Sequence, residues 1–255
     1  MKKTLVLMIF LLSFCSLLFA EDAFRYLVKA NDYHEISVKR ERKIELPSSG
    51  WHEGLYIDDD QIWVNNGKGF NTDVLDIRTG KQTGQIIVPG TFMEGISKLP
   101  NGKYIWSDWY DRAFFFGELI DRELVIKARI SVGDLFPAGI IAADDDIFVI
   151  GWERALDTKY YLLKFDKKGM LIEKTGIKDI QEPSQLAWDG KYLWISSWNS
   201  EKVYKVDISD YSLKGFFKTN IDRTTGIVWD GNGFWVTGTT EDIYVFKISK
   251  NPLMS

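Results

Sequence analysis

Five copies of one short pattern recur along the chain and constrain its fold more than any other feature. Each copy opens with a small or acidic residue, usually followed by Gly, and continues as a short apolar strand. A tight Asp/Asn/Gly turn then leads into a second strand with a central aromatic residue. The copies begin at residues 53, 94, 138, 184 and 225, so they are spaced 41 to 46 residues apart. An all-β repeat of this length is typical of propeller blades, and we predict an all-β, five-bladed β-propeller.

The later part of each copy predicts how the ring closes. A third strand follows in every copy and a fourth in four of them, for example at 85–88 and 213–217, but the fifth copy ends without one. The segment 35–46, which precedes the first copy, can supply the missing strand. Closure by an N-terminal strand leaves no open sheet edge. Residues 21–33 either add an edge strand or stay loose, and a sixth, degenerate blade at the N-terminus is the main alternative.

The N-terminus has the composition of a targeting segment. Lys2 and Lys3 precede an apolar run over 5–19, and Ala20 ends it before two acidic residues. This pattern predicts a cleaved secretory signal over 1–20 and one propeller domain over 21–255, because a membrane span needs about 20 apolar residues. The bulky Phe14 before Cys15 disfavours lipidation. We therefore expect an exported protein without a stable membrane span, either periplasmic or extracellular.

Composition excludes several classes of function. Cys15 is the single cysteine and lies in the predicted signal, so the mature chain has no disulfide and no thiolate site. The formal net charge is −4 and becomes more negative once the signal is removed, which argues against a nucleic-acid partner. A peptide or small-molecule substrate and a monomeric state are expected instead.

Metal and cofactor motifs are also missing from the sequence. His34 and His52 are the two histidines, too few for a His-rich zinc site. The acidic runs 58–60 and 144–146 fall at turns between first and second strands, where Asp is favoured by turn chemistry. No Gly-rich phosphate loop precedes a helix. We expect no cofactor and no metal.

Propeller geometry predicts where a site can form. The loops that enter the first strands and the loops that follow the second strands open on one face of the ring, around a shared mouth. The entering segments are 51–53, 92–94, 136–138, 182–184 and 223–225. The following segments are 65–66, 108–109, 152, 198–199 and 237–239. A concave, aromatic-lined mouth with a few polar groups is the default binding site.

The tryptophans divide into two groups. Those at equivalent mid-strand positions predict blade packing, and these are Trp63, Trp106, Trp194 and Trp235. Trp109, Trp152 and Trp198 instead follow second strands at the mouth. They are candidate walls of a binding pocket, or else simple aromatic cover over the blade ends.

Glu53 and Glu94 hold the same repeat position in adjacent copies. Either carboxylate could be an ordinary loop acid. Alternatively, a partly desolvated carboxyl near a second acid has a raised pKa and can exchange protons near neutral pH. With Asn65, the two acids would also suit a calcium-type oxygen-ligand site, as in a propeller lactonase.

The chain resembles the plant/bacterial type of glutamine cyclotransferase. The resemblance rests on WHEGL at 51–55, DIRTGK at 76–81 and FMEGI at 92–96, with weaker matches at 226–230 and 235–238. This family is a metal-free five-bladed propeller that converts N-terminal glutaminyl residues of peptides to pyroglutamyl with release of ammonia. The resemblance implies that Glu94 is the catalytic acid/base and that Trp109 is a pocket wall. Glu53 stands where the family usually has Gln.

Several positions depart from the family pattern. The third copy opens with Phe136 where Trp is expected, Ser196 or Ser197 replaces an Asn, and Thr239 replaces a Lys. The main hypothesis is a glutaminyl-peptide cyclotransferase, with Glu94 catalytic. Its substrate would contact Glu53, Asn65, Trp109, Trp152 and Trp198. The alternative is a non-catalytic extracytoplasmic propeller that binds a peptide, a glycan or an envelope protein.

Overall fold

The computed structural model describes residues 24–46, 50–69, 71–239 and 242–249, all in strands, bridges, turns and connecting segments. The predicted signal over 1–20 lies outside these residues. No helix long and apolar enough to cross a bilayer occurs in the described part of the chain.

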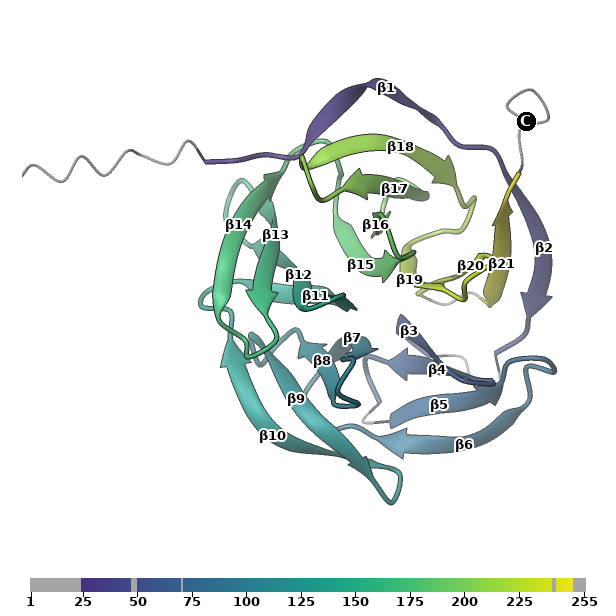
Figure 1. The fold of residues 1–255 in the computed structure, drawn as a ribbon. Helices are drawn as coiled ribbons and strands as arrows, with labels where there is room; N and C mark the ends of the chain where they lie inside the picture. Colours follow the sequence, from purple (N-terminus) through teal and green to yellow (C-terminus); the bar gives the residue numbers. More distant parts are fainter. Residues whose placement is uncertain (1–23, 47–49, 70, 240–241, 250–255) are drawn as a thin grey trace, which may run out of the picture.

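Consecutive four-stranded antiparallel meanders follow one another around a central axis and form a β-propeller (Figure 1). The first two are β3 (His52–Asp58), β4 (Gln61–Asn66), β5 (Asn71–Asp76) and β6 (Gln82–Ile87), then β7 (Met93–Lys98), β8 (Tyr104–Asp108), β9 (Ala113–Ile120) and β10 (Glu123–Ser131). A parallel bridge between Ile87 of β6 and Glu123 of β10 joins them into one eight-stranded sheet.

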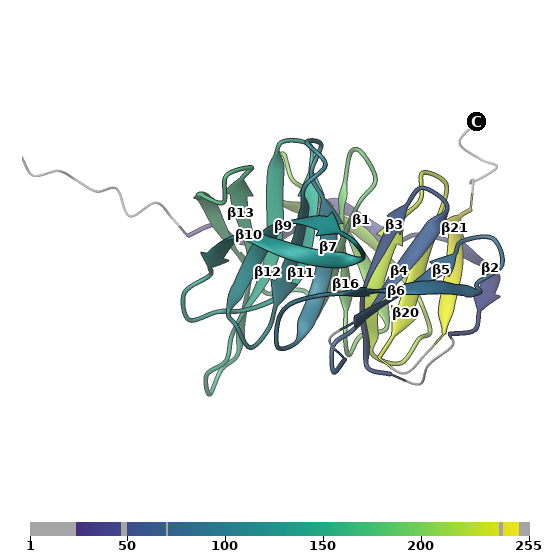
Figure 2. The same cartoon turned by 90° about the horizontal axis from the view of Figure 1, so that it is seen from below.

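The remaining meanders complete the ring. They are β11 (Phe136–Ala143), β12 (Asp146–Glu153), β13 (Lys159–Asp166) and β14 (Leu171–Ile177); β15 (Pro183–Trp188), β16 (Leu193–Ser197), β17 (Lys202–Asp207) and β18 (Ser212–Lys218); and β19 (Thr224–Trp229), β20 (Phe234–Gly238) and β21 (Ile243–Ile248). Viewed from the side, loops project from both faces of the ring (Figure 2).

The N-terminal strands tie the ends of the chain together. β2 (Val38–Ile44) pairs antiparallel with β21, so the segment predicted from the sequence does supply the fourth strand of the last meander. β1 (Val28–Glu35) lies parallel to β18 as an extra edge strand. The pairing covers the outer side of β21 and makes β2 the outermost strand of that sheet.

The inner strands β3, β7, β11, β15 and β19 contact one another in a closed cycle around the axis. This proximity explains the Gly of the repeat pattern. A Cβ on Gly54 would lie 2.5 Å from the backbone oxygen of Glu94, and one on Gly95 would lie 2.8 Å from the backbone nitrogen of Ile140. In the fourth copy Gln185 replaces this Gly, and its side-chain oxygen would lie 2.8 Å from the same Cβ on Gly95.

The repeated tryptophans are buried in the packing between sheets, as the sequence predicted. Trp63, Trp106, Trp194 and Trp235 are all at most 4% exposed. Trp194 donates its indole N–H to Asp189 at 2.7 Å, and the Asp189 carboxylate also accepts backbone N–H groups of the following turn. One Asp therefore fixes both the turn and the core indole, and Asp230 does the same in the last copy, where it accepts the Trp235 indole N–H at 2.7 Å.

The acidic turns lie among cations and phenols. Asp58 accepts hydrogen bonds from the Tyr104 hydroxyl at 2.9 Å and from Lys98 at 3.2 Å. Asp146 forms an ion pair with Lys164 at 2.8 Å. Among the described residues, no group of three or more His, Cys, Asp and Glu side chains could hold a metal ion.

Candidate functional site

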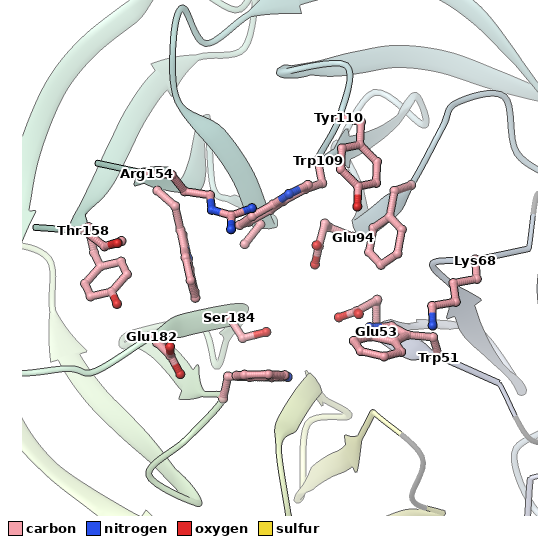
Figure 3. Close-up of a pocket in the computed structure, with 15 residues that line it drawn as sticks. Trp51, Glu53, Lys68, Glu94, Trp109, Tyr110, Arg154, Thr158, Glu182 and Ser184 are labelled. Carbon is pink, nitrogen blue, oxygen red and sulfur yellow. The ribbon is translucent and has the colours of Figure 1, made fainter. Parts of the chain in front are cut away.

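A cavity of about 490 Å³ opens at the mouth of the ring (Figure 3). Its aromatic lining consists of Trp51, Phe92, Trp109, Tyr110, Trp152, Tyr160 and Trp198. Its charged lining consists of Glu53, Lys68, Glu94, Arg154 and Glu182. Five of the six residues singled out from the sequence therefore line one cavity, and Asn65 is the exception.

Glu53 and Glu94 form a pair in the wall of the cavity. Each is the second residue of its strand, β3 or β7, so the repeat places both side chains at the same depth. Both are buried, with 4% and 7% exposure, and their carboxyl groups hydrogen-bond to each other. Such a bond requires a proton on one of the two carboxyls. The indole of Trp51 donates a further hydrogen bond to Glu53.

Burial is the main cause of a raised pKa at both carboxyls. It raises the pKa of Glu94 to about 8; the hydrogen bond from Glu53 opposes this shift, and the negative charge of Asp108 adds to it. The pKa of Glu53 rises well above its usual range, through burial first and then through the charge of Glu94. The pair therefore retains a proton at neutral pH, shared between the two carboxyls.

Asp108 fixes the loop that leads to Glu94. Its carboxylate accepts the backbone N–H groups of Thr91 at 2.6 Å, Phe92 at 2.7 Å and Asp111 at 3.0 Å. Gly90 is needed beside it, because a Cβ there would collide with the Asp108 carboxylate. Asp108 thus holds the start of β7 in place and acts electrostatically on Glu94.

Asn65 lies behind Glu94 rather than in the cavity wall. It is fully buried, its amide donates to the backbone oxygen of Glu94 at 3.2 Å, and its carbonyl accepts the Thr72 hydroxyl at 3.0 Å. These contacts tie β4 and β5 to β7. The side chain that the sequence placed among substrate contacts has its polar atoms engaged within the protein.

Trp109 and Trp152 form a continuous aromatic wall. Their ring centroids lie 5.4 Å apart in an edge-to-face arrangement, Trp109 also packs against Phe136 at 5.1 Å, and Trp152 packs against Tyr160 at 4.9 Å. The Trp152 indole donates to the backbone oxygen of Pro183 at 2.7 Å. Phe136, which departs from the family pattern, therefore supports the wall from behind Trp109.

Trp198 stands on another side of the cavity, held by a different bond. Its indole N–H donates to the Thr239 hydroxyl at 3.2 Å, and the Arg223 guanidinium lies 5.2 Å from its ring centre. Thr239, another departure from the family pattern, thus orients a pocket wall.

The combined arrangement is an aromatic-lined cavity with a proton-holding carboxyl pair in its wall. Burial of the two carboxyls keeps their pKa high, so they can give and take protons near neutral pH. This is the chemistry of general acid/base catalysis on a small polar group.

Comparison with known proteins supports the fold. No protein-family profile and no curated protein sequence matches this chain. Among solved structures, the glutaminyl cyclase of Myxococcus xanthus superposes with a TM-score of 0.69 over 86% of this chain and 99% of that chain, at 10% identity. The chain shares its fold with a glutaminyl cyclase.

Other solved propellers are similar at lower scores. The virginiamycin B lyase of Staphylococcus aureus gives a TM-score of 0.52 at 10% identity, over 84% of this chain and 100% of that chain. A chain of a nidogen/laminin complex gives 0.55 at 14% identity, over 74% of this chain and 73% of that chain. The glutaminyl cyclase fold is the better match of the three.

Sequence reasoning did not single out several residues that line the cavity. Lys68, Tyr110, Arg154 and Thr158 come from the loops between second and third strands, and Tyr160 comes from the start of β13. The Lys68 ammonium lies 4.1 Å from the ring centre of Trp51. Their common signal is position, since they lie between the end of a second strand and the start of the third.

Proposed function

We propose that this chain is a five-bladed glutaminyl-peptide cyclotransferase, which converts N-terminal glutaminyl residues to pyroglutamyl with release of ammonia. The observation that carries the proposal is the buried Glu53–Glu94 pair in an aromatic cavity at the mouth of the ring. The fold shared with a glutaminyl cyclase and the sequence patterns around both acids support the same activity. The five-blade count is supported by the five repeats and by the cycle of inner strands.

The reaction needs little beyond positioning and proton transfer. The α-amine nitrogen of the substrate attacks its own side-chain amide carbon, a ring C–N bond forms, and the bond to the amide nitrogen breaks. The attacking nitrogen loses a proton and the departing nitrogen gains one, so ammonia leaves and atoms balance. Because the nucleophile is tethered, holding the reactive conformer supplies much of the rate enhancement.

Glu94 is the group that moves this proton. Its pKa of about 8 is close to that of a peptide α-amine, roughly 7.7 to 8.0, so transfer between them is nearly balanced in free energy. Glu53 binds the α-amine of the substrate and, through its hydrogen bond, keeps the Glu94 carboxyl in place. Trp109, Trp152 and Trp198 enclose the glutaminyl side chain and exclude water.

The N-terminal segment and the net charge of the chain bear on where the proposed enzyme acts and on what kind of partner it binds. The basic and apolar segment over 1–20 supports export to the periplasm or the extracellular space, and the negative net charge fits a peptide rather than a nucleic-acid partner. We propose a monomeric enzyme that acts without a cofactor.

The test uses the purified protein and a peptide that begins with Gln. Mass spectrometry should show loss of one ammonia, and Glu94→Gln should lower the rate by about 100-fold or more, the scale of a lost general acid/base. The control is Glu201→Gln, which changes an exposed carboxylate outside the cavity. Absence of conversion by the unaltered protein, or equal rates for it and Glu94→Gln, would refute the assignment.

A further inference from the structure

The cavity has a second acidic position, separate from the Glu53–Glu94 pair. Glu182 lies across the cavity from the pair, in the segment that enters β15 (Figure 3). The cavity is larger than a single glutaminyl side chain requires, so a substrate bound at the pair extends toward this wall. Glu182 therefore lies where the second residue of a peptide substrate would be.

The charge of Glu182 is not compensated by the protein. Among the described residues it forms no ion pair, and its Oε2 is buried without a hydrogen-bond donor. The neighbouring ionisable side chain is Tyr160, a neutral phenol, whose pKa is raised by burial and then by the charge of Glu182. A half-buried carboxylate without a cation favours binding of one.

The walls beside Glu182 suit a cation. The ring centroids of Trp152 and Tyr160 lie 4.9 Å apart. The Trp152 indole donates to the backbone oxygen of Pro183, the residue after Glu182. Aromatic rings attract Lys and Arg side chains through their faces and pack against the aliphatic stem of a lysine. Ser184 adds a hydroxyl on the same side of the cavity.

Arg154 is the charged residue that could instead bind a substrate anion on this side of the cavity, since Lys68 lies beside Trp51 and Glu53 (Figure 3). Its side chain is exposed, and its guanidinium lies 5.7 Å from the ring centre of Phe136. A hydrated, ring-stacked guanidinium gains little from a bound anion, whereas the partly desolvated carboxylate of Glu182 gains more from a bound cation. The charge balance of this wall thus favours a basic side chain over an acidic one.

We propose that Glu182, with Trp152 and Tyr160, forms a subsite for a basic side chain, lysine or arginine, at the second position of the substrate. The inference rests on the proposed function, because it takes the substrate to be a peptide whose first residue lies at Glu53 and Glu94. Glu182 is a specificity-determining residue and takes no part in proton transfer.

The experiment compares three peptides, Gln-Lys-Ala, Gln-norleucine-Ala and Gln-Glu-Ala, with the unaltered protein, Glu182→Gln and Glu201→Gln. Norleucine keeps the four-carbon stem of lysine without its ammonium group. Glu201 is a matched control because it is a carboxylate outside the cavity and shares the left-handed backbone of Glu182, with φ of 51° against 46°. Calorimetry with Met-Lys-Ala and Met-norleucine-Ala, which cannot cyclise, measures the subsite independently of turnover.

We expect kcat/KM for the lysyl peptide to exceed that for norleucine by about tenfold in the unaltered protein and Glu201→Gln, and to lose this advantage in Glu182→Gln. Equal rates for the two peptides, a preference for the glutamyl peptide, or a lysine preference retained in Glu182→Gln would overturn the subsite and leave the cyclase activity standing. If Glu182→Gln does not fold, the peptide series with the unaltered protein decides alone.

If no peptide cyclises, the proposed function fails and calorimetry decides the subsite. Tighter binding of Met-Lys-Ala than of Met-norleucine-Ala, weakened by Glu182→Gln, supports a cation subsite in a non-cyclising protein. Equal affinities overturn it.

Discussion

The carboxyl groups of Glu53 and Glu94 hydrogen-bond to each other although both are buried and neither forms an ion pair among the described residues. Two carboxyls in one apolar setting cost the folded state free energy as soon as either must ionise. The pair is therefore poised for proton transfer and is also a source of instability.

The first prediction concerns stability against pH. The pKa of Glu94 is about 8 in the folded protein against an ordinary value of 4.5, and that of Glu53 is raised in the same direction. Between these values the pair in the folded state holds protons that it has lost in the unfolded state, so the contribution of the pair to stability is full below about pH 4.5 and is lost as pH rises toward 8. The slope is about 1.4 kcal/mol per pH unit for each retained proton.

Replacing Glu53 by Gln removes one of these protons. Urea unfolding at pH 5 and pH 8 should show that Glu53→Gln loses less stability over this interval than the unaltered protein. Equal losses in the two proteins would mean that the pair does not retain protons.

The second prediction separates a positioning role for Asn65 from a substrate contact. Asn65→Ala leaves the Glu94 backbone oxygen and the Thr72 hydroxyl without their partner, so the free energy of unfolding should fall by about 1–3 kcal/mol. Asn199→Ala, at an exposed position on the mouth face, should change it little. A variant of Asn65 with unchanged stability and a raised KM would instead assign it to the substrate.

The third prediction tests how Trp198 is held. Thr239→Val keeps the volume of the side chain but removes the acceptor of the Trp198 indole N–H. The free energy of unfolding should therefore fall by about 1 kcal/mol. Turnover of Gln-initiated peptides should fall several-fold as this wall loosens, and Thr239→Ser should restore it. Unchanged kinetics in Thr239→Val would show that the bond does not position Trp198 for catalysis.

The fourth prediction concerns the Gly of the repeat. Gly95→Ala should destabilise the protein severely, because its Cβ would lie 2.8 Å from both the Ile140 backbone nitrogen and the Gln185 side-chain oxygen. Gly102→Ala is the control: it meets nothing within 4 Å and bears only the strain of its φ of +85°, about 1–2 kcal/mol. Thermal melting measures the stability of both variants. Similar decreases in melting temperature for Gly95→Ala and Gly102→Ala would show that the inner strands can move apart.

Much of the fold was predictable because a repeated sequence pattern marks residues that occupy equivalent places in successive sheets. The spacing of the Gly-containing starts located the inner strands, and the missing fourth strand of the last copy indicated the role of 35–46, within which β2 forms. Equivalence also brought Glu53 and Glu94 together, since residues at one repeat position on adjacent inner strands lie side by side. The aromatic wall followed from the same argument.

The other site residues were not predictable because they do not repeat. Arg154 and Lys68 lie in loops of unequal length, where the repeat fixes no side-chain direction. Asn65 was assigned to the mouth by position alone. Its amide instead turns to the Glu94 backbone, a contact set by three-dimensional packing between β4 and β7.

The pairing of β2 with β21 has a consequence for how the molecule is made. The strand at 38–44 has its partner at 243–248, so nearly the whole chain must be synthesised before the two can meet. Until then a nascent chain exposes an unpaired edge and the apolar flank of its last meander, the state in which β-rich chains aggregate. The ring therefore cannot close before residues 243–248 are present, and a chain truncated before residue 243 would keep β2 without its partner.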